Sequence, residues 1–171
     1  KHINIPRGIY RINMANCKVL ETISFPGNLN RIVSFNGDQN LKNVSVPDSD
    51  GYTSAMYIDF SNCYGVEKVE LPEGLLTFGP FLNCHKLKTV NIPSTVDKFN
   101  ASSFMNCYSL KKIVFDTQNS ISWTSGNTMT DGSGIEEADF SKATNMQSIL
   151  VPIFYNAKNL KRVKFPFYRV P

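Results

Sequence analysis

The chain has 171 residues, of which 42% are hydrophobic and 19% are charged, and its formal net charge at pH 7 is +4. A chain of this length suits one domain with a sizeable core, so residues 1–171 are expected to form a single domain. No apolar run approaches the roughly 18 residues that a membrane-spanning helix needs, and no transmembrane segment is expected. A small positive charge supports nucleic-acid binding only where the basic side chains gather on one face.

A repeat runs through the sequence from its first residues to its last. The segments 16–26, 62–72 and 83–93 share the order Asn-Cys-x-x-apolar-x-x-apolar-x-apolar-Pro, and 106–116 follows it up to the Pro. Weaker copies occupy 37–47, 131–141 and 156–166. The Leu-like anchors, 21 to 25 residues apart, are Leu20, Leu41, Val66, Leu87, Leu110, Ile135 and Leu160. A large apolar residue stands six positions before each anchor. Repeats of this period indicate a solenoid, in which each coil buries its apolar face against its neighbours.

Each repeat is expected to contribute one short strand to a continuous parallel sheet. Its closing residues alternate between apolar and polar, which is typical of a strand with one buried face, and the Pro ends the strand because it lacks an N–H donor. The inward-pointing pairs are Ile3/Ile5, Ile23/Phe25, Val44/Val46, Val69/Leu71, Val90/Ile92, Ile113/Phe115, Ala138/Phe140 and Val163/Phe165. Eight strands spaced about 4.8 Å apart predict a sheet roughly 35 Å long.

The rest of each coil contains a second apolar spacing, as at Val96, Phe99 and Phe104, which predicts a second short strand or an extended turn. The Phe-x-Asn-Cys-x-x-Leu stretch is too short for a full helix and predicts a single helical or 3₁₀ turn. The longer connections, 48–57 and 117–130, are expected to bulge outward as loops.

The pattern Phe-x-Asn-Cys-x-x-Leu-x-x-Val-x-Ile-Pro resembles the BspA-like class of leucine-rich repeat, and the resemblance covers essentially the whole chain. It implies a leucine-rich-repeat solenoid that winds as a right-handed superhelix of about seven coils. It also implies a bacterial protein at the cell surface or outside the cell, which adheres to a protein or glycan on host or neighbouring cells. The alternative is a structural spacer that projects another domain and binds nothing itself.

The chain is expected to be a piece of a longer protein, because its first residues fall inside a repeat and its last lie close to a strand. End-to-end self-association is a further expectation, since solenoids without polar caps leave apolar coil ends uncovered.

The four cysteines share one position of the repeat: Cys17, Cys63, Cys84 and Cys107. Asp38, Gly132 and Ala157 fill the same position in the other coils, as expected of a packing position for small residues. A disulfide between adjacent coils is the alternative. A zinc site is not expected, because zinc needs four convergent ligands and His85 should point away from the inward Cys84.

An Asn precedes each of these cysteines and is expected to bond backbone groups of its turn, with a carbohydrate-binding row as the alternative. The residues that follow the anchors alternate in sign along much of the solenoid: Glu21, Lys42, Glu67, Lys88, Lys111, Glu136 and Lys161. Because opposite charges on neighbouring coils cancel, no phosphate-binding stripe forms there and nucleic-acid binding is not expected.

Nothing in the sequence points to catalysis. It has two histidines and contains no Gly-rich phosphate loop, paired acid motif or nucleophile elbow. The chain is therefore expected not to be an enzyme and to need no cofactor or metal.

A candidate contact surface lies two positions before the anchors on three consecutive coils, where Tyr64, His85 and Tyr108 stand. Flanked by inward-pointing positions, these side chains should face solvent and stack about 5 Å apart. Exposed Tyr is an efficient contact residue, since it combines a rigid ring with a polar tip. Trp123, on the 117–130 connection, is a candidate for the rim of the same patch. The alternative is that the rings only shield the coil edge.

Overall fold

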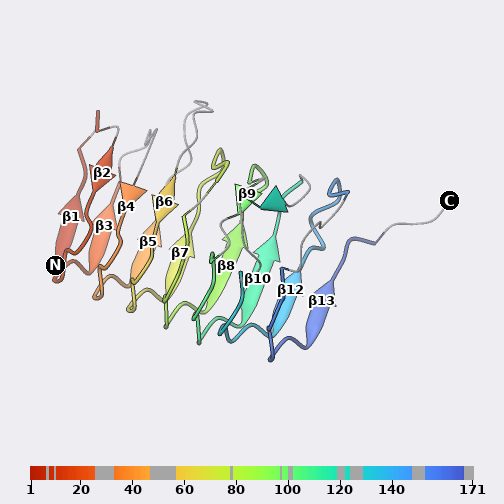
Figure 1. Ribbon diagram of the computed structural model, residues 1–171. Helices are drawn as coiled ribbons and strands as arrows, with labels where there is room; N and C mark the ends of the chain where they lie inside the picture. The colour runs from red at the N-terminus through yellow and green to blue at the C-terminus, as the bar shows by residue number, and fades with distance from the viewer. Residues whose placement is uncertain are drawn as a thin grey trace.

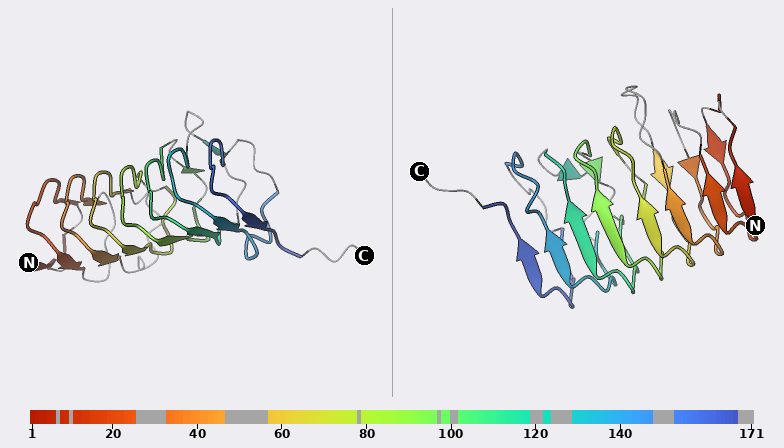
Figure 2. Two further views of the ribbon diagram at one scale, coloured as in Figure 1. Left: turned by 90° about the horizontal axis from the view of Figure 1, so that it is seen from below. Right: turned by 180° about the vertical axis from the view of Figure 1, so that it is seen from behind.

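A computed structural model describes residues 1–6, 8–9, 11–25, 33–46, 57–77, 79–96, 98–99, 102–118, 129–147 and 153–167, together with the backbone of 122–123. Successive coils stack side by side along one axis, so that the first and last coils form the two ends of the solenoid (Figures 1 and 2). Every pairing between strands is parallel and joins neighbouring coils, which is the arrangement that the period predicted.

The longest sheet, here called the front sheet, contains one strand from each repeat. Its strands are β1 (His2–Asn4), β3 (Thr22–Ser24), β5 (Asn43–Ser45), β7 (Lys68–Glu70), β8 (Thr89–Ile92), β10 (Lys112–Phe115), β12 (Glu137–Asp139) and β13 (Arg162–Lys164), in that spatial order. The register pairs Val90 with Ile113, and Ile113 with Ala138, as the offset from the anchors predicted. The prediction of a continuous parallel sheet is therefore confirmed.

Shorter strands form the opposite part of the coils. β2 (Ile12–Asn13), β4 (Val33–Ser34) and β6 (Ile58–Asp59) make a three-stranded sheet, and β9 (Lys98–Phe99) pairs with β11 (Ser122–Trp123). The predicted second strand is thus present, and β11 lies within the connection that was predicted to be a loop. Within the described residues five coils contain such a strand, fewer than the seven coils expected. The coil between β7 and β8 contributes only the bridging residue Thr77, and the corresponding stretch of the last coil, 148–152, lies outside the described residues.

The predicted helical turns are wrong. The described residues contain no helix, and the Phe-to-Leu stretches form pairs of turns instead. The reason is the Asn in the middle of the stretch, which adopts a positive φ, as at Asn83 (62°), and a left-handed residue ends any right-handed helical turn.

The core is a set of side-chain columns that run along the solenoid axis. Phe35, Phe60, Phe81 and Phe104 stack with ring centroids 5.2, 5.1 and 5.6 Å apart, and all four are fully buried. A parallel column holds the anchors, and Leu87 there is also fully buried. Each aromatic pair adds about 0.5–1.5 kcal/mol beyond the burial of its area. Because neighbours in a column come from different coils, the packing energy lies largely between coils.

Candidate contact surface

The same backbone geometry recurs at one turn of successive coils and directs the surface side chains outward. The residue before the Cys position has φ between 58° and 63° in five coils, at Asn16, Asn62, Asn83, Asn106 and Asn156. Asn tolerates this left-handed conformation better than other residues with a Cβ. The left-handed residue reverses the chain, so the Cys that follows points inward and the residue after it points to solvent, as at Cys84 and His85.

The Asn side chains bond each other from coil to coil. Asn106 Nδ2 donates to Asn83 Oδ1 at 2.9 Å, and Asn83 Nδ2 donates to Asn62 Oδ1 at 2.8 Å. Asn62 Nδ2 continues the ladder to Asn36 Oδ1 at 3.2 Å. The expectation that these amides bond backbone groups of their own turn is therefore wrong for the central coils. Partly buried amide ladders use the amide groups internally, which weakens the alternative of a carbohydrate-binding row.

The cysteines are packing residues. Cys63, Cys84 and Cys107 are fully buried, and each thiol donates to the carbonyl oxygen of the stacked Phe one coil earlier, at 3.0 to 3.1 Å. All four cysteines are free, so the packing interpretation is confirmed and the disulfide alternative is not. Burial raises the pKa of Cys63 and of Cys107 to about 12, which keeps these thiols protonated at neutral pH. No cluster of metal-ligating side chains occurs among the described residues.

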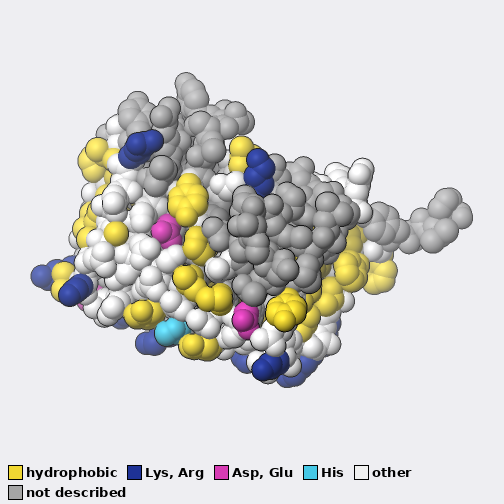
Figure 3. All heavy atoms as spheres, viewed as in Figure 1, with side chains coloured by type: hydrophobic (Ala, Val, Ile, Leu, Met, Phe, Trp, Pro, Cys, Tyr) yellow, Lys and Arg dark blue, Asp and Glu magenta, His cyan; other side chains and the backbone are white. Residues whose placement is uncertain are grey.

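Tyr64, His85 and Tyr108 form one stack on the solvent side of this turn, here called the aromatic row. The ring centroids are 4.8 Å apart in both pairs, with interplanar angles of 16° and 29°. Tyr64 is 36% exposed and Tyr108 is 56% exposed. The expected stacking is thus confirmed, and so is the exposure of both Tyr side chains, whereas His85 between them is half-buried. Figure 3 shows one face of the molecule with its side chains coloured by type, including one visible histidine (cyan) near hydrophobic side chains (yellow).

In the coil that follows Tyr108, the stretch from the left-handed residue to the anchor is one residue shorter than in the neighbouring coils, and this coil is here called the short coil. Gly132, with φ of 67°, takes the left-handed position, and Ser133 takes the Cys position because its N–H donates to Thr130 O as a Cys N–H does to the carbonyl three residues earlier. The assignment of Gly132 to the Cys position is therefore wrong, and Ser133, which is buried, is not the counterpart of Tyr108 on the surface.

Two glycines show which residue the short coil lacks. A Cβ on Gly134 would meet the carbonyl oxygens of Tyr108 and Leu110. Leu110 is the anchor of the preceding coil, and Tyr108 stands two positions before it. A Cβ on Gly65 would meet the carbonyl oxygens of the same two positions of the coil before it, Gln39 and Leu41. Gly134 is thus equivalent to Gly65, and the missing residue is the counterpart of Tyr64.

The comparisons with known proteins agree with this geometry. Residues 7–122 and 59–168 match the sequence model of the family described as BspA type leucine rich repeat region, in six copies. The chain belongs to this BspA-type leucine-rich-repeat family. Its fold is similar to the crystal structure of a T. pallidum leucine rich repeat protein (TpLRR), with a TM-score of 0.53 and 18% sequence identity over 82% of this chain and 68% of that one. No curated protein matches the sequence.

Solenoids of the BspA type are repeat-based binding or scaffold modules, and they typically lack enzymatic activity. No helix in the described part of the chain is long and apolar enough to cross a membrane.

Trp123 does not belong to the turn that carries the aromatic row. Its backbone lies on β11 and pairs with Phe99 of β9, in the short sheet in the upper part of Figure 1, whereas the turns that carry the row lead into the lower ends of β7, β8 and β10. Its side chain lies outside the described residues. The backbone thus brings together three of the four candidate residues and separates the fourth.

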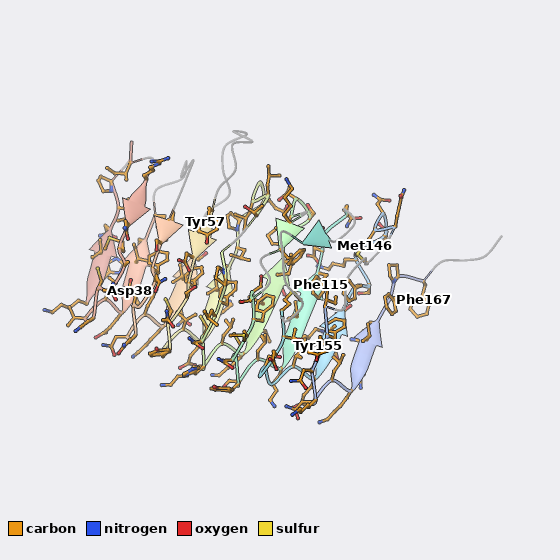
Figure 4. All side chains as sticks on the ribbon, viewed as in Figure 1. Asp38, Tyr57, Phe115, Met146, Tyr155 and Phe167 are labelled. Carbon is orange, nitrogen blue, oxygen red and sulfur yellow. The ribbon has the colours of Figure 1, made fainter. Side chains whose placement is uncertain are left out.

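Asp38 departs from the BspA-type pattern because it occupies a Cys position. It is fully buried in the second coil and is labelled in Figure 4. Its Oδ1 accepts a hydrogen bond from Cys17 N at 2.5 Å, while Oδ2 is buried without a partner among the described residues. Burial raises the pKa of Asp38 from 3.8 to about 6.

The charged side chains pair across coils. Lys88 contacts Glu67 at 2.6 Å, and Glu136 contacts both Lys111 at 2.6 Å and Lys161 at 2.8 Å. These hydrogen bonds lower the pKa of Glu136 to about 2. A second network on the outer face of the front sheet contains Lys112, Glu137, Asp139, Arg162 and Lys164. Exposed pairs contribute little to stability, but their alternation breaks up any stripe of uniform charge.

The last coil exposes apolar side chains at its outer end. Phe165 is 57% exposed, and Phe167 extends beyond β13 (Figure 4). End-to-end association of the solenoid stays a prediction. A head-to-tail arrangement would bring Lys161 and Arg162 toward Lys1 of the first coil, and these like charges oppose it.

Proposed function

We propose that this chain is a non-enzymatic binding module that docks a partner protein on its aromatic row. The observation that carries the proposal is the continuous stack on three neighbouring coils of the exposed Tyr64 and Tyr108 with the half-buried His85 between them. Neither Tyr is buried in the core, and the columns of Phe and Leu side chains stabilise the coils without them. Rigid aromatic residues with polar tips are enriched at protein interfaces because they lose little conformational entropy on binding.

The geometry of the stack favours a protein over a glycan. Sugars bind aromatic residues through open ring faces, but neighbouring rings cover both faces of His85 and one face of each Tyr, so that four of the six ring faces are covered. The row therefore presents ring edges, two hydroxyls and an imidazole, which suit hydrogen bonds to an extended backbone or to polar side chains.

Family membership supports the wider setting of the proposal. Proteins with BspA-type repeats are generally exposed at the cell surface or secreted, so we place the partner on host or neighbouring cells and the activity as adhesion. A solenoid whose coils are joined by Asn hydrogen bonds also fits the alternative role of a spacer. The experiment described next separates that role from binding.

The experiment is a binding array of host-matrix proteins and glycans, probed with the chain and with the double variant Tyr64→Ser/Tyr108→Ser. Val19→Ser is the matched control, because Val19 is also an exposed apolar residue but lies in a coil outside the row. The double variant should lose at least tenfold in affinity for a protein on the array, with an unchanged thermal midpoint, and the control should bind normally. Unchanged binding by the double variant would contradict the proposal, and binding of glycans alone would overturn the choice of a protein. A chain that binds nothing would support the spacer.

A further inference from the structure

The aromatic row ends at Tyr108, where the short coil leaves a gap. Gly132, Ser133 and Gly134 cross this level of the solenoid without a side chain at the position of the row. The far face of the Tyr108 ring therefore has no neighbour of the row, which agrees with its greater exposure, 56% against 36% for Tyr64.

The row resumes one coil later with Lys158. Its N–H donates to Asn156 O at 2.9 Å, the same turn bond that His85 N makes to Asn83 O at 2.9 Å, so Lys158 stands at the position of His85 in its own coil. Lys158 is exposed and forms no ion pair within the described part of the chain. Tyr108 and Lys158 thus stand on either side of the missing position.

The width of the gap matches one ring. Neighbouring rings of the row are 4.8 Å apart, so two steps separate Tyr108 from Lys158 by roughly 9.6 Å, twice the spacing of adjacent strands. A planar ring placed halfway would lie at the stacking distance from Tyr108 and within reach of the long, exposed Lys158 side chain, whose ammonium can make a cation–π contact at up to about 6 Å. Of the residues that cross this level, Gly132 is exposed, whereas Ser133 and Gly134 are buried.

We propose that this row gap receives one aromatic side chain of the partner protein, which continues the stack between Tyr108 and Lys158. This inference rests on the proposed function and names the group that the row recognises. Trp and Tyr are favoured over Phe and over aliphatic side chains, because cation–π attraction is strongest for the indole ring and is absent for an aliphatic group. Such a single deeply placed ring is typical of the residues that dominate protein interfaces.

The chain itself offers a variant that fills the gap. The regular coil reads Asn62-Cys63-Tyr64-Gly65-Val66, whereas the short coil reads Gly132-Ser133-Gly134-Ile135. Insertion of one tyrosine between Ser133 and Gly134 restores the five-residue length and places a ring of the chain itself in the gap. Because both ends of the insertion keep their equivalents in the regular coil, we expect the variant to fold with a thermal midpoint at least as high as that of the wild type.

The test is a titration of ¹⁵N-labelled chain with N-acetyl-tryptophanamide, followed by two-dimensional NMR, with N-acetyl-leucinamide and methyl β-glucoside as comparison probes. We expect millimolar binding of the tryptophan probe only, with shifts confined to the amides of Tyr108, 132–134 and Lys158. The insertion variant should lose these shifts, and Lys158→Ala should weaken binding several-fold. Val19→Ser, at an exposed apolar residue outside the row, should keep them.

Three outcomes would overturn the inference: equal binding of the leucine probe, binding of the glucoside alone, or shifts that persist in the insertion variant. Tyr108→Ser gives the same information if the insertion variant does not fold, because it removes one wall of the gap. These results separate the inference from the proposed function. Absence of probe binding together with loss of array binding by Tyr64→Ser/Tyr108→Ser would remove the gap as a site and leave the aromatic row as the contact surface.

Discussion

The regular coils at residues 57–115 and the short coil at 129–135 solve the same packing problem in two ways. In the regular coils every column is continuous, with Phe rings, thiols, Asn amides and exposed rings in register. In the short coil the aromatic row stops and Asp131, in place of an Asn, accepts from Asn156 Nδ2 at 2.7 Å, yet β12 still pairs with β10 in the predicted register. The column of anchors, which continues through Ile135, is therefore enough to keep the register of the sheet. The Phe column, where Thr130 takes the Phe position, and the surface row are both interrupted without disturbing it.

The largest expected effect on stability comes from truncating a buried side chain in one of the core columns. Leu87→Ala should lower the free energy of unfolding by about 2–5 kcal/mol, because a fully buried Leu leaves a cavity when truncated. Leu160→Ala is the matched variant in the last coil, where the anchor is only partly buried, and it should cost clearly less. Chemical denaturation measures both, and equal losses would show that stability does not depend on neighbours on both sides.

The short coil should depend on its glycine. Gly134→Ala places a Cβ against the carbonyl oxygen of Tyr108, a backbone atom that cannot move aside, and should cost about 1–3 kcal/mol. Gly8→Ala, where a Cβ would meet nothing within 4 Å, should cost only the strain of its positive φ, about 1 kcal/mol. Thermal unfolding of the two variants decides the point. If Gly134→Ala is as stable as the wild type, Gly134 does not lie close to the carbonyl oxygen of Tyr108, and the deletion is placed at the wrong position.

Asp38 should make the free energy of unfolding depend on pH, which a Cys at the same position would not do. Its pKa is raised from 3.8 to about 6 in the folded state, so its contribution to stability is fully present below pH 3.8 and is lost as the pH rises through 6. Asp38→Asn should therefore raise the free energy of unfolding by about 1–3 kcal/mol at pH 7.5, the usual cost of an unsatisfied buried polar group, and by much less at pH 4. Glu21→Gln, at an exposed carboxylate, serves as the control. A gain for Asp38→Asn that is the same at both pH values would contradict this account.

The smallest effect concerns the exposed ion pairs. Glu136→Gln removes the contacts with Lys111 and Lys161 but should leave the thermal midpoint nearly unchanged at physiological salt, because exposed pairs are well screened. A large loss would mean that the charges, and not the core columns, hold the coils in register.

Much of the fold could be predicted from the sequence because apolar residues recur with the period of the repeat. A buried position accepts few alternatives, so the anchors determined the strand register correctly at every coil, including Ala138. The turn conformation was less accessible, since a left-handed Asn looks like any polar residue until its φ is known. The Asn ladder depends on side-chain contacts between coils 21 to 26 residues apart, which no local pattern shows.

The candidate site was predicted in part. The spacing of Tyr64, His85 and Tyr108 from their anchors was enough to predict the stack, because neighbouring coils repeat the same geometry. The gap could not be predicted from the distance to the anchor, because a one-residue deletion between Ser133 and Gly134 changes the spacing between Ile135 and every position before the deletion. The pair Gly65 and Gly134, each just before its anchor, was the available signal.

The most direct test of the account is a crystal structure of the chain grown with N-acetyl-tryptophanamide, beside the variant with a tyrosine inserted after Ser133. The account predicts an indole ring stacked on the far face of Tyr108 with the Lys158 side chain across its other face, and in the variant the inserted ring in the same place. A wild-type structure in which Lys158 itself covers Tyr108 and the indole is absent would contradict it.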